Sequence, residues 1–118
     1  MNTNYSEQVL KMAEVLDMRN AEDIVIINIS NASIIADYFI ICTGKASNHV
    51  RLLSDELEQS MGKEQVQCTR IEGYQDGRWI AMDFSDIIVH IFHKDERDFY
   101  DIERLWKSDN NWTNYPIK

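Results

Sequence analysis

The sequence predicts one α/β (α+β) domain in which a mixed sheet of about five strands is flanked by helices. Helical and strand-like apolar patterns follow one another in the order α-β-β-α-β-β-β-α. The length of 118 residues suits one hydrophobic core rather than two. The domain is expected to cover residues 1–106, and residues 107–118 are expected to form a polar C-terminal tail.

Each expected element rests on a local pattern of apolar residues. Helices repeat their apolar residues at helical spacing, and strands are runs of β-branched and aromatic residues. In chain order the elements are a helix at 6–18, strands at 23–29 and 37–43, a helix at 47–62, strands at 66–71, 79–83 and 86–92, and a helix at 96–106.

Polar residues and a glycine mark where these helices begin and end. Ser6, Ser47 and Asp95 are candidate N-caps of the three helices, and Gly62 occupies the position of a C′ residue. The strand at 66–71 is expected to pair in parallel with the strand at 37–43, through a right-handed crossover made by the second helix.

The strands at 79–83 and 86–92 are predicted to form a hairpin. A two-residue loop at Phe84 and Ser85 would place Trp79 opposite His90. Side chains alternate along a strand, so one set is expected on the core face: Ile80, Met82, Ile87, Val89 and Ile91. The other face would carry Trp79, Ala81, Ile88, His90 and Phe92.

Two features are expected in the C-terminal part of the chain. In the last helix Phe99, Ile102, Leu105 and Trp106 form an apolar stripe. The tail that follows is polar, and Trp112 or Tyr115 is expected to pin it.

The charge and the cysteine count exclude several classes of protein. A formal net charge of −8 and an isoelectric point near 4.7 disfavour direct binding of nucleic acid or anionic lipid and suit a basic protein partner. No apolar run approaches the ~18 residues of a membrane helix, and the start lacks a signal peptide pattern, so we expect a cytoplasmic protein. Cys42 and Cys68 are expected to be reduced thiols.

The histidines do not form a metal motif. His90 and His93 point to opposite faces of a strand, so they cannot chelate one ion without a bulge. No nucleophile elbow is present, and Cys42 lies in the middle of a strand. We therefore expect no catalytic residue, no metal and no cofactor.

A nucleotidyltransferase-like enzyme or a nucleotide-binding protein is the alternative hypothesis. It would use Thr43, Gly44 and Ser47 for phosphate and Asp83 with Asp86 for magnesium. The turn matches no phosphate-loop spacing, and an isoleucine stands where a second strand acid would be needed.

The face that carries Trp79, His90 and Phe92 has two interpretations. It is either core beneath a helix or an aromatic contact surface for a basic protein, rimmed by acids. The residue types alone leave both open.

Motifs along nearly the whole chain closely resemble the ribosomal silencing factor family, also called RsfS or Iojap-like. They are SIIADYFII at 33–41, TG at 43–44, SNHV at 47–50, EG at 72–73, GRW at 77–79, Asp83, DIIVHIF at 86–92 and RDFYDIERLW at 97–106. The family fold resembles a nucleotidyltransferase core that lacks the catalytic acids.

The resemblance implies a translational repressor without enzymatic activity. Such a factor binds large-subunit ribosomal protein fourteen and sterically blocks joining with the small subunit, which lowers translation when nutrients are limiting. The resemblance also suggests a homodimer. The expected partner-binding residues are Trp79, Asp83, Asp86, Ile88, His90 and Phe92. The hypothesis predicts that Trp79→Glu abolishes binding to the large subunit and leaves the fold intact.

Overall fold

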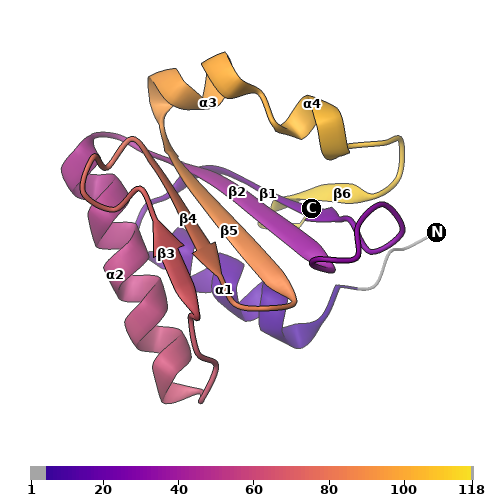
Figure 1. Ribbon diagram of the computed structural model, residues 1–118, viewed down its shortest axis with the longest axis horizontal. Coiled ribbons are helices and arrows are strands. Elements are labelled where there is room, and N and C mark those ends of the chain that lie inside the picture. The colour runs from indigo at the N-terminus through magenta and orange to yellow at the C-terminus, as the bar shows by residue number, and fades with distance from the viewer. Residues whose placement is uncertain (1–4, 118) are drawn as a thin grey trace.

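Among residues 5–117, which the computed structural model describes, six strands form one mixed sheet (Figure 1). The strand order is β3-β4-β5-β2-β1-β6. The elements are α1 (Glu7–Met18), β1 (Glu22–Asn28), β2 (Tyr38–Gly44), α2 (Ser47–Lys63), β3 (Arg70–Glu72), β4 (Trp79–Asp83), β5 (Ile87–His93), α3 (Lys94–Tyr100), α4 (Glu103–Trp106) and β6 (Trp112–Tyr115). The fold is therefore a mixed α+β domain, as the sequence predicted.

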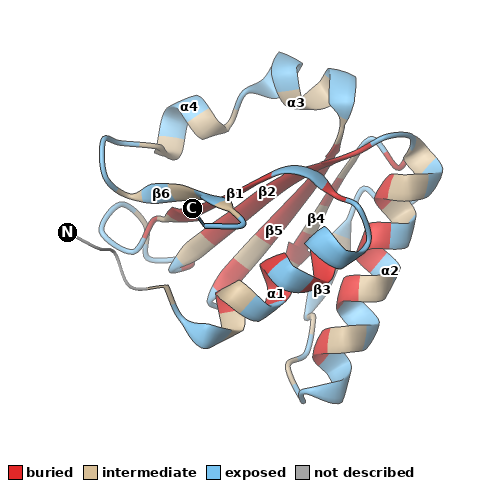
Figure 2. Cartoon of the chain, turned by 180° about the vertical axis from the view of Figure 1, so that it is seen from behind, coloured by how far each residue is buried: buried red, intermediate tan, exposed pale blue. Residues whose placement is uncertain are grey.

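The two faces of the sheet are covered differently. Helices α1 and α2 pack on one face and bury apolar side chains against all the central strands. The short helices α3 and α4 lie on the other side of the sheet (Figure 1) and contain no buried residue. Figure 2 shows this difference, with buried residues on the sheet and on the inner sides of α1 and α2 and none on α3 or α4.

The face beneath α1 and α2 is the main core. The five residues predicted for the core face of the hairpin all belong to it, and each is at most 1% exposed.

Helix α1 begins as predicted, because the Ser6 hydroxyl accepts a hydrogen bond from the Val9 amide at 3.2 Å. Cys42 is buried in this core, and burial raises the pKa of its thiol to about 12. Cys42 and Cys68 are both free thiols.

The predicted hairpin register is wrong by two residues. Trp79 pairs with Phe92, and Asp83 pairs with Ile88. The turn lies one residue further along, because the Phe84 amide bonds the Ile87 carbonyl at 2.9 Å and Phe84 is buried in the core. Ser85 takes the positive φ of 78°. A shift of two residues preserves the alternation, so each side chain stays on its predicted face.

The predicted partner of the strand at 66–71 is also wrong. Only Arg70–Glu72 forms a strand there, and it pairs antiparallel with β4 at the edge of the sheet. The parallel neighbour of β2 is β5. A central parallel strand is covered on both faces, and β5 has the nearly continuous apolar sequence that this requires, whereas β3 is short and exposed.

The ends of α2 differ from the prediction. Ala46 is the N-cap and gives no side-chain cap, and Ser47 is the first helical residue. Gly62 lies inside the last turn, and the residue with a left-handed backbone is Gln65, with φ 63°. The His49 Nδ1 atom accepts a hydrogen bond from the Lys45 amide at 2.9 Å. A side chain within α2 thus satisfies a backbone amide of the turn before the helix.

The predicted last helix is broken into two. His93 and not Asp95 caps α3, since its Nδ1 accepts the Asp95 amide at 3.3 Å. Asp101 ends α3 in a left-handed conformation with φ 43°, which aspartate tolerates better than most residues. Of the predicted apolar stripe, Ile102 and Trp106 pack against the sheet, whereas Phe99 and Leu105 are 80% and 78% exposed.

The segment predicted as a polar tail contributes a strand. Residues 112–115 form β6, which pairs antiparallel with β1, so the sheet has six strands in the described chain and not about five. Asn111 anchors the approach to this strand, because its side-chain amide donates to the carbonyls of Asn28 and Trp106 at 3.0 and 2.9 Å. Tyr115 packs against the main core, as one of the two expected anchors.

Candidate partner-binding face

The face of the sheet opposite α1 and α2 is built from rows of side chains that the register places side by side. Strand pairing aligns residues of β3, β4, β5 and β2 across the sheet. One row is Arg70, Asp83, Ile88 and Phe39, the next is Glu72, Ala81, His90 and Ile41, and the third is Trp79, Phe92 and Thr43. Charged residues thus stand at the β3 edge, and apolar residues stand towards the middle of the sheet.

The β3 side of this face forms an open hollow. Its volume is about 320 Å³, and the residues that line it are Arg70, Glu72, Ala81, Asp83 and Ile88. Towards β2 and β1 the same face is closed by a second apolar cluster in which Trp106 meets Phe39 edge-on, with ring centres 5.2 Å apart. We call the hollow with its five lining residues the β3–β5 face.

Trp79 stands beside the β3–β5 face within an aromatic cluster. Its ring stacks on Phe92 at 4.9 Å and lies 4.8 Å from the ring of Tyr100 of α3. Its Nε1 donates a hydrogen bond to His90 Nδ1 at 3.1 Å. Trp79 is partly buried, so one part of its ring holds the cluster together and another part reaches the surface.

His90 is a buried, neutral member of this cluster. It is 8% exposed, and its ring meets Phe39 edge-on at 4.7 Å. Because Nδ1 accepts from Trp79, the proton of the neutral ring is assigned to Nε2, which has no hydrogen-bond partner. Burial lowers the pKa of His90 from 6.5 to about 4.

This buried histidine should make stability depend on pH. An unfolded His90 takes up a proton below about pH 6.5, whereas the folded one does so only near pH 4. The unfolded state therefore binds more protons between these values, and we expect His90 to remove about 3 kcal/mol of stability as the pH falls from 6.5 to 4. Urea denaturation of the wild type and of His90→Phe at each pH measures this contribution, and equal pH slopes for the two proteins would contradict it.

The predicted partner-binding residues divide into three groups in the structure. Asp83 and Ile88 line the hollow, and Trp79 is partly accessible beside it. Asp86 is exposed at the hairpin turn, outside the hollow. His90 and Phe92 are buried and pack in the aromatic cluster around Trp79.

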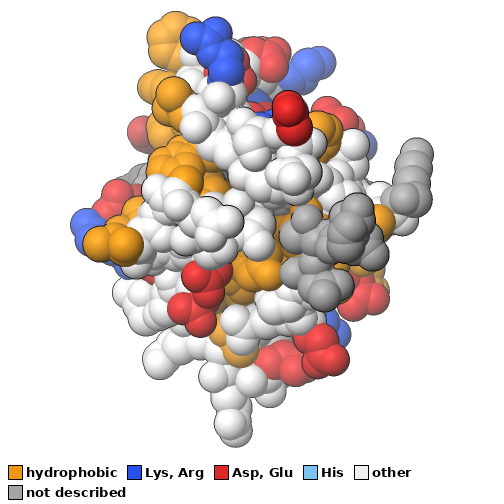
Figure 3. All heavy atoms as spheres, turned by 90° about the vertical axis from the view of Figure 1, so that its right-hand side faces the viewer, with side chains coloured by type: hydrophobic (Ala, Val, Ile, Leu, Met, Phe, Trp, Pro, Cys, Tyr) orange, Lys and Arg blue, Asp and Glu red, His pale blue; other side chains and the backbone are white. Residues whose placement is uncertain are grey.

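Arg70, Glu72 and Tyr100 also belong to this region. Sequence reasoning missed Arg70 and Glu72, and it recognised Tyr100 within the family motif at 97–106 but did not place it among the partner-binding residues. Arg70 and Glu72 sit at the β3 edge, which the predicted pairing had placed beside a different strand. The aromatic residues on exposed α3 are the signal that could have placed Tyr100, which is 48% exposed, at this surface. Figure 3 shows hydrophobic side chains gathered at the top of its view, the level at which α3 lies in Figure 1.

Arg97 fixes α3 and α4 against the sheet. The Arg97 Nη1 atom donates hydrogen bonds to the Asp23 carbonyl at 2.7 Å and to Thr43 Oγ1 at 2.8 Å. The Arg97 Nε atom donates one to Glu103 Oε2 at 2.8 Å. Burial alone would raise the pKa of Glu103, but the hydrogen bond and charge of Arg97, with Lys107, outweigh it and the pKa is lowered. One guanidinium thus joins β1, β2, α3 and α4.

A second arginine, which directly precedes β4, ties α3 to that edge of the sheet. Arg78 donates two hydrogen bonds of 2.7 Å to the Glu96 carboxylate, in the paired geometry that suits guanidinium and carboxylate. The hydrogen bond from Arg78 lowers the pKa of Glu96. The helix that carries Tyr100 next to Trp79 is therefore anchored through two adjacent residues, Glu96 and Arg97.

The turn proposed for phosphate binding in the alternative hypothesis is occupied by protein groups. Arg97 bonds Thr43 Oγ1, and a Cβ added at Gly77 would lie 3.0 Å from the Ser47 Cβ, so the 73–77 loop packs directly on Ser47. Asp83 accepts the Ser85 amide at 2.8 Å. Among residues 5–117 no three His, Cys, Asp or Glu side chains are grouped as metal ligands would be.

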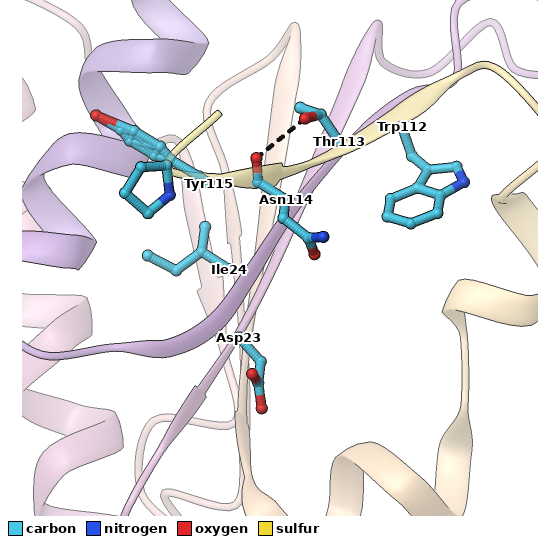
Figure 4. Close-up of a pocket in the computed structure, with 7 residues that line it drawn as sticks. Asp23, Ile24, Trp112, Thr113, Asn114 and Tyr115 are labelled. Carbon is cyan, nitrogen blue, oxygen red and sulfur yellow. Dashed lines mark hydrogen bonds between the residues drawn. The ribbon is translucent and has the colours of Figure 1, made fainter. Parts of the chain in front are cut away.

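Another hollow lies at the opposite edge of the sheet. Its volume is about 610 Å³, and it runs along β6, with Asp23 and Ile24 of β1 beside Trp112–Pro116 (Figure 4). The Thr113 hydroxyl donates to the Asn114 carbonyl at 3.0 Å within it. Because β3 and β6 are the two edges of the sheet, this hollow is remote from the β3–β5 face.

Within the described chain, no helix is long and apolar enough to cross a membrane.

The fold and the face together define a small α+β protein whose sheet presents an open hollow bordered by charged residues and an aromatic cluster. The chain matches the family model for the ribosomal silencing factor during starvation over residues 2–117, and it belongs to this family.

Relatives support this assignment along most of the chain. The chain is 37% identical to the ribosomal silencing factor RsfS of Bacillus subtilis, over 85% of its own length and 86% of that protein. It is also 37% identical to the RsfS of Halalkalibacterium halodurans, over 86% and 87% of the two chains. A crystal structure of a Chromobacterium violaceum protein superposes with a TM-score of 0.81 at 25% identity and covers 91% of this chain and 92% of that one.

Proposed function

We propose that this protein represses translation by binding the large ribosomal subunit through ribosomal protein fourteen, so that the small subunit cannot join. The family resemblance supports this function, and the relatives are named for ribosomal silencing. The factor acts in the cytoplasm when nutrients are limiting, by occupying a surface and without a catalytic step.

The open β3–β5 face is the observation that carries the proposal. A helix covers the β2 and β1 part of the same sheet side, whereas the hollow leaves Ala81, Asp83 and Ile88 accessible beside Trp79. Contact surfaces that bind proteins tightly combine aromatic anchors with a polar rim. The β3–β5 face supplies the charged β3 residues of such a rim, and Trp79 and Tyr100 beside it supply the aromatic anchors.

The charge of the protein suits a basic partner. The net charge of −8 attracts positively charged ribosomal proteins and raises the rate at which the two meet. The affinity is expected to come from the apolar and aromatic contacts, because charges on the rim of an interface add little.

The proposal is tested by filling the hollow. Ala81→Arg is expected to weaken binding to purified large subunits by at least roughly tenfold, because it places a bulky cation where a basic partner would dock. Co-sedimentation with large subunits measures binding, and subunit joining is followed with added small subunits. If Ala81→Arg folds, binds like the wild type and still blocks joining, the β3–β5 face is not the docking surface.

A matched control exists at the other edge of the sheet. Asn114→Arg makes the same change in charge on exposed β6 and should leave binding unchanged.

We further propose, from the family resemblance, that the free protein forms a homodimer. Light scattering with and without the isolated ribosomal protein separates self-association from binding to that partner.

A further inference from the structure

We propose that the β3–β5 face receives one lysine side chain of the ribosomal partner, and that Asp83 selects it. This inference rests on the proposed function, since it names the chemical group that the docking surface recognises. It is carried by the shape of the hollow, by the hydrogen bonds of Asp83 and by the charges around it.

The hollow has the form of a site for an amphipathic chain. Ala81 and Ile88 give it an apolar floor in neighbouring positions on β4 and β5, and Asp83 pairs directly with Ile88 across the strands. A lysine side chain has the matching composition, with four methylenes that pack on apolar surface and a cationic end.

Asp83 is held in position and keeps one oxygen free. Its Oδ1 accepts the Ser85 amide at 2.8 Å, which fixes the carboxylate at the start of the hairpin turn. Among the described residues no ion pair involves Asp83, although Arg70 stands opposite it on β3. The Arg70 Nη2 atom instead lies 2.6 Å from Glu72 Oε2.

The hollow therefore carries one uncompensated negative charge. Arg70 and Glu72 neutralise each other, and Asp83 is the remaining charge in the lining. A cation that enters would meet an acceptor already oriented by the turn, so little ordering is required on binding.

The carboxylate of Asp83 suits lysine better than arginine. Arginine binds carboxylates best through two parallel hydrogen bonds, one to each oxygen. Oδ1 of Asp83 already accepts the Ser85 amide and would have to be shared with a guanidinium, whereas Oδ2 has no donor among the described residues and can bind an ammonium group by itself.

The test compares two removals of one negative charge, one in the hollow and one on the opposite side of the sheet. Asp83→Asn keeps the shape and the acceptor for the Ser85 amide, and we expect it to weaken binding to isolated ribosomal protein fourteen by roughly tenfold. Asp17→Asn is the matched control, because Asp17 is exposed on α1, which covers the other face of the sheet, and it should bind nearly as the wild type does. The difference between the two variants should shrink from about 0.05 M to 0.5 M salt.

A second measurement identifies the partner group. Acetylation of the ribosomal protein, read by mass spectrometry at matched occupancy, should show a lysine that is protected by the wild type and by Asp17→Asn but not by Asp83→Asn. If the wild type binds and Asp83→Asn binds with the same affinity, this inference is overturned and the proposed function stands. The same conclusion follows if the wild type binds but protects no lysine in a way that depends on Asp83. Absence of wild-type binding to both the large subunit and the isolated ribosomal protein overturns both.

Discussion

Trp79→Glu is expected to lower the free energy of unfolding by about 3 kcal/mol, because it removes a packed ring and places a carboxylate against apolar neighbours. The indole contacts Phe92 and Tyr100, and it supplies the hydrogen bond to His90. Urea denaturation at pH 7 measures the change, and thermal melting should show a decrease of roughly 10 °C.

Trp79→Phe is the control for this prediction. It keeps an aromatic ring and loses the hydrogen bond to His90, so the expected loss is about 1 kcal/mol. A Trp79→Glu protein as stable as the wild type would show that the aromatic cluster does not hold α3 to the sheet. The structure thus changes the expectation from sequence that this variant would leave the fold intact, and it makes Ala81 the better position for probing the partner.

Arg97→Met is expected to cost about 3 kcal/mol of stability, because it leaves the partly buried Glu103 carboxylate without its main partner. It also removes the hydrogen bonds to the Asp23 carbonyl and Thr43 Oγ1. Chemical denaturation gives the change in stability. Hydrogen exchange of the amides of α3 and α4 should show faster opening of these helices than of β5.

Arg104→Met is the matched control for this substitution. Arg104 lies on exposed α4, and the same change there should alter stability by less than about 0.5 kcal/mol. Equal losses in the two variants would mean that the effect comes from helix composition and not from the contacts of Arg97.

Much of the fold could be predicted because its signals are local. The helix at 6–18, the strands around residues 25, 40, 80 and 90, and the two faces of the hairpin follow from spacing along a few residues. The assignment of faces was correct even though the register was wrong, because alternation along a strand survives a shift of two residues.

The candidate site could be predicted only in part. Trp79, Asp83 and Ile88 were predicted because they belong to a recognisable strand motif, and in the structure they lie at the open hollow or beside it. His90 and Phe92 lie on the same face but are buried, since neighbouring Phe39 and Trp79 pack against them. A pattern of alternation gives the direction of a side chain and not the depth at which it lies.

The sequence by itself determined the fold class, the order of the helices and most strands, the core face of the hairpin and the membership of a family. The tertiary structure alone decided that β5 lies beside β2, that residues 112–115 complete the sheet, and that Asp101 divides the last helix. It also decided which part of the aromatic face remains open. The physical reason is that element type depends on neighbouring residues, whereas strand partners and burial depend on contacts between residues far apart in the chain, where many pairings compete.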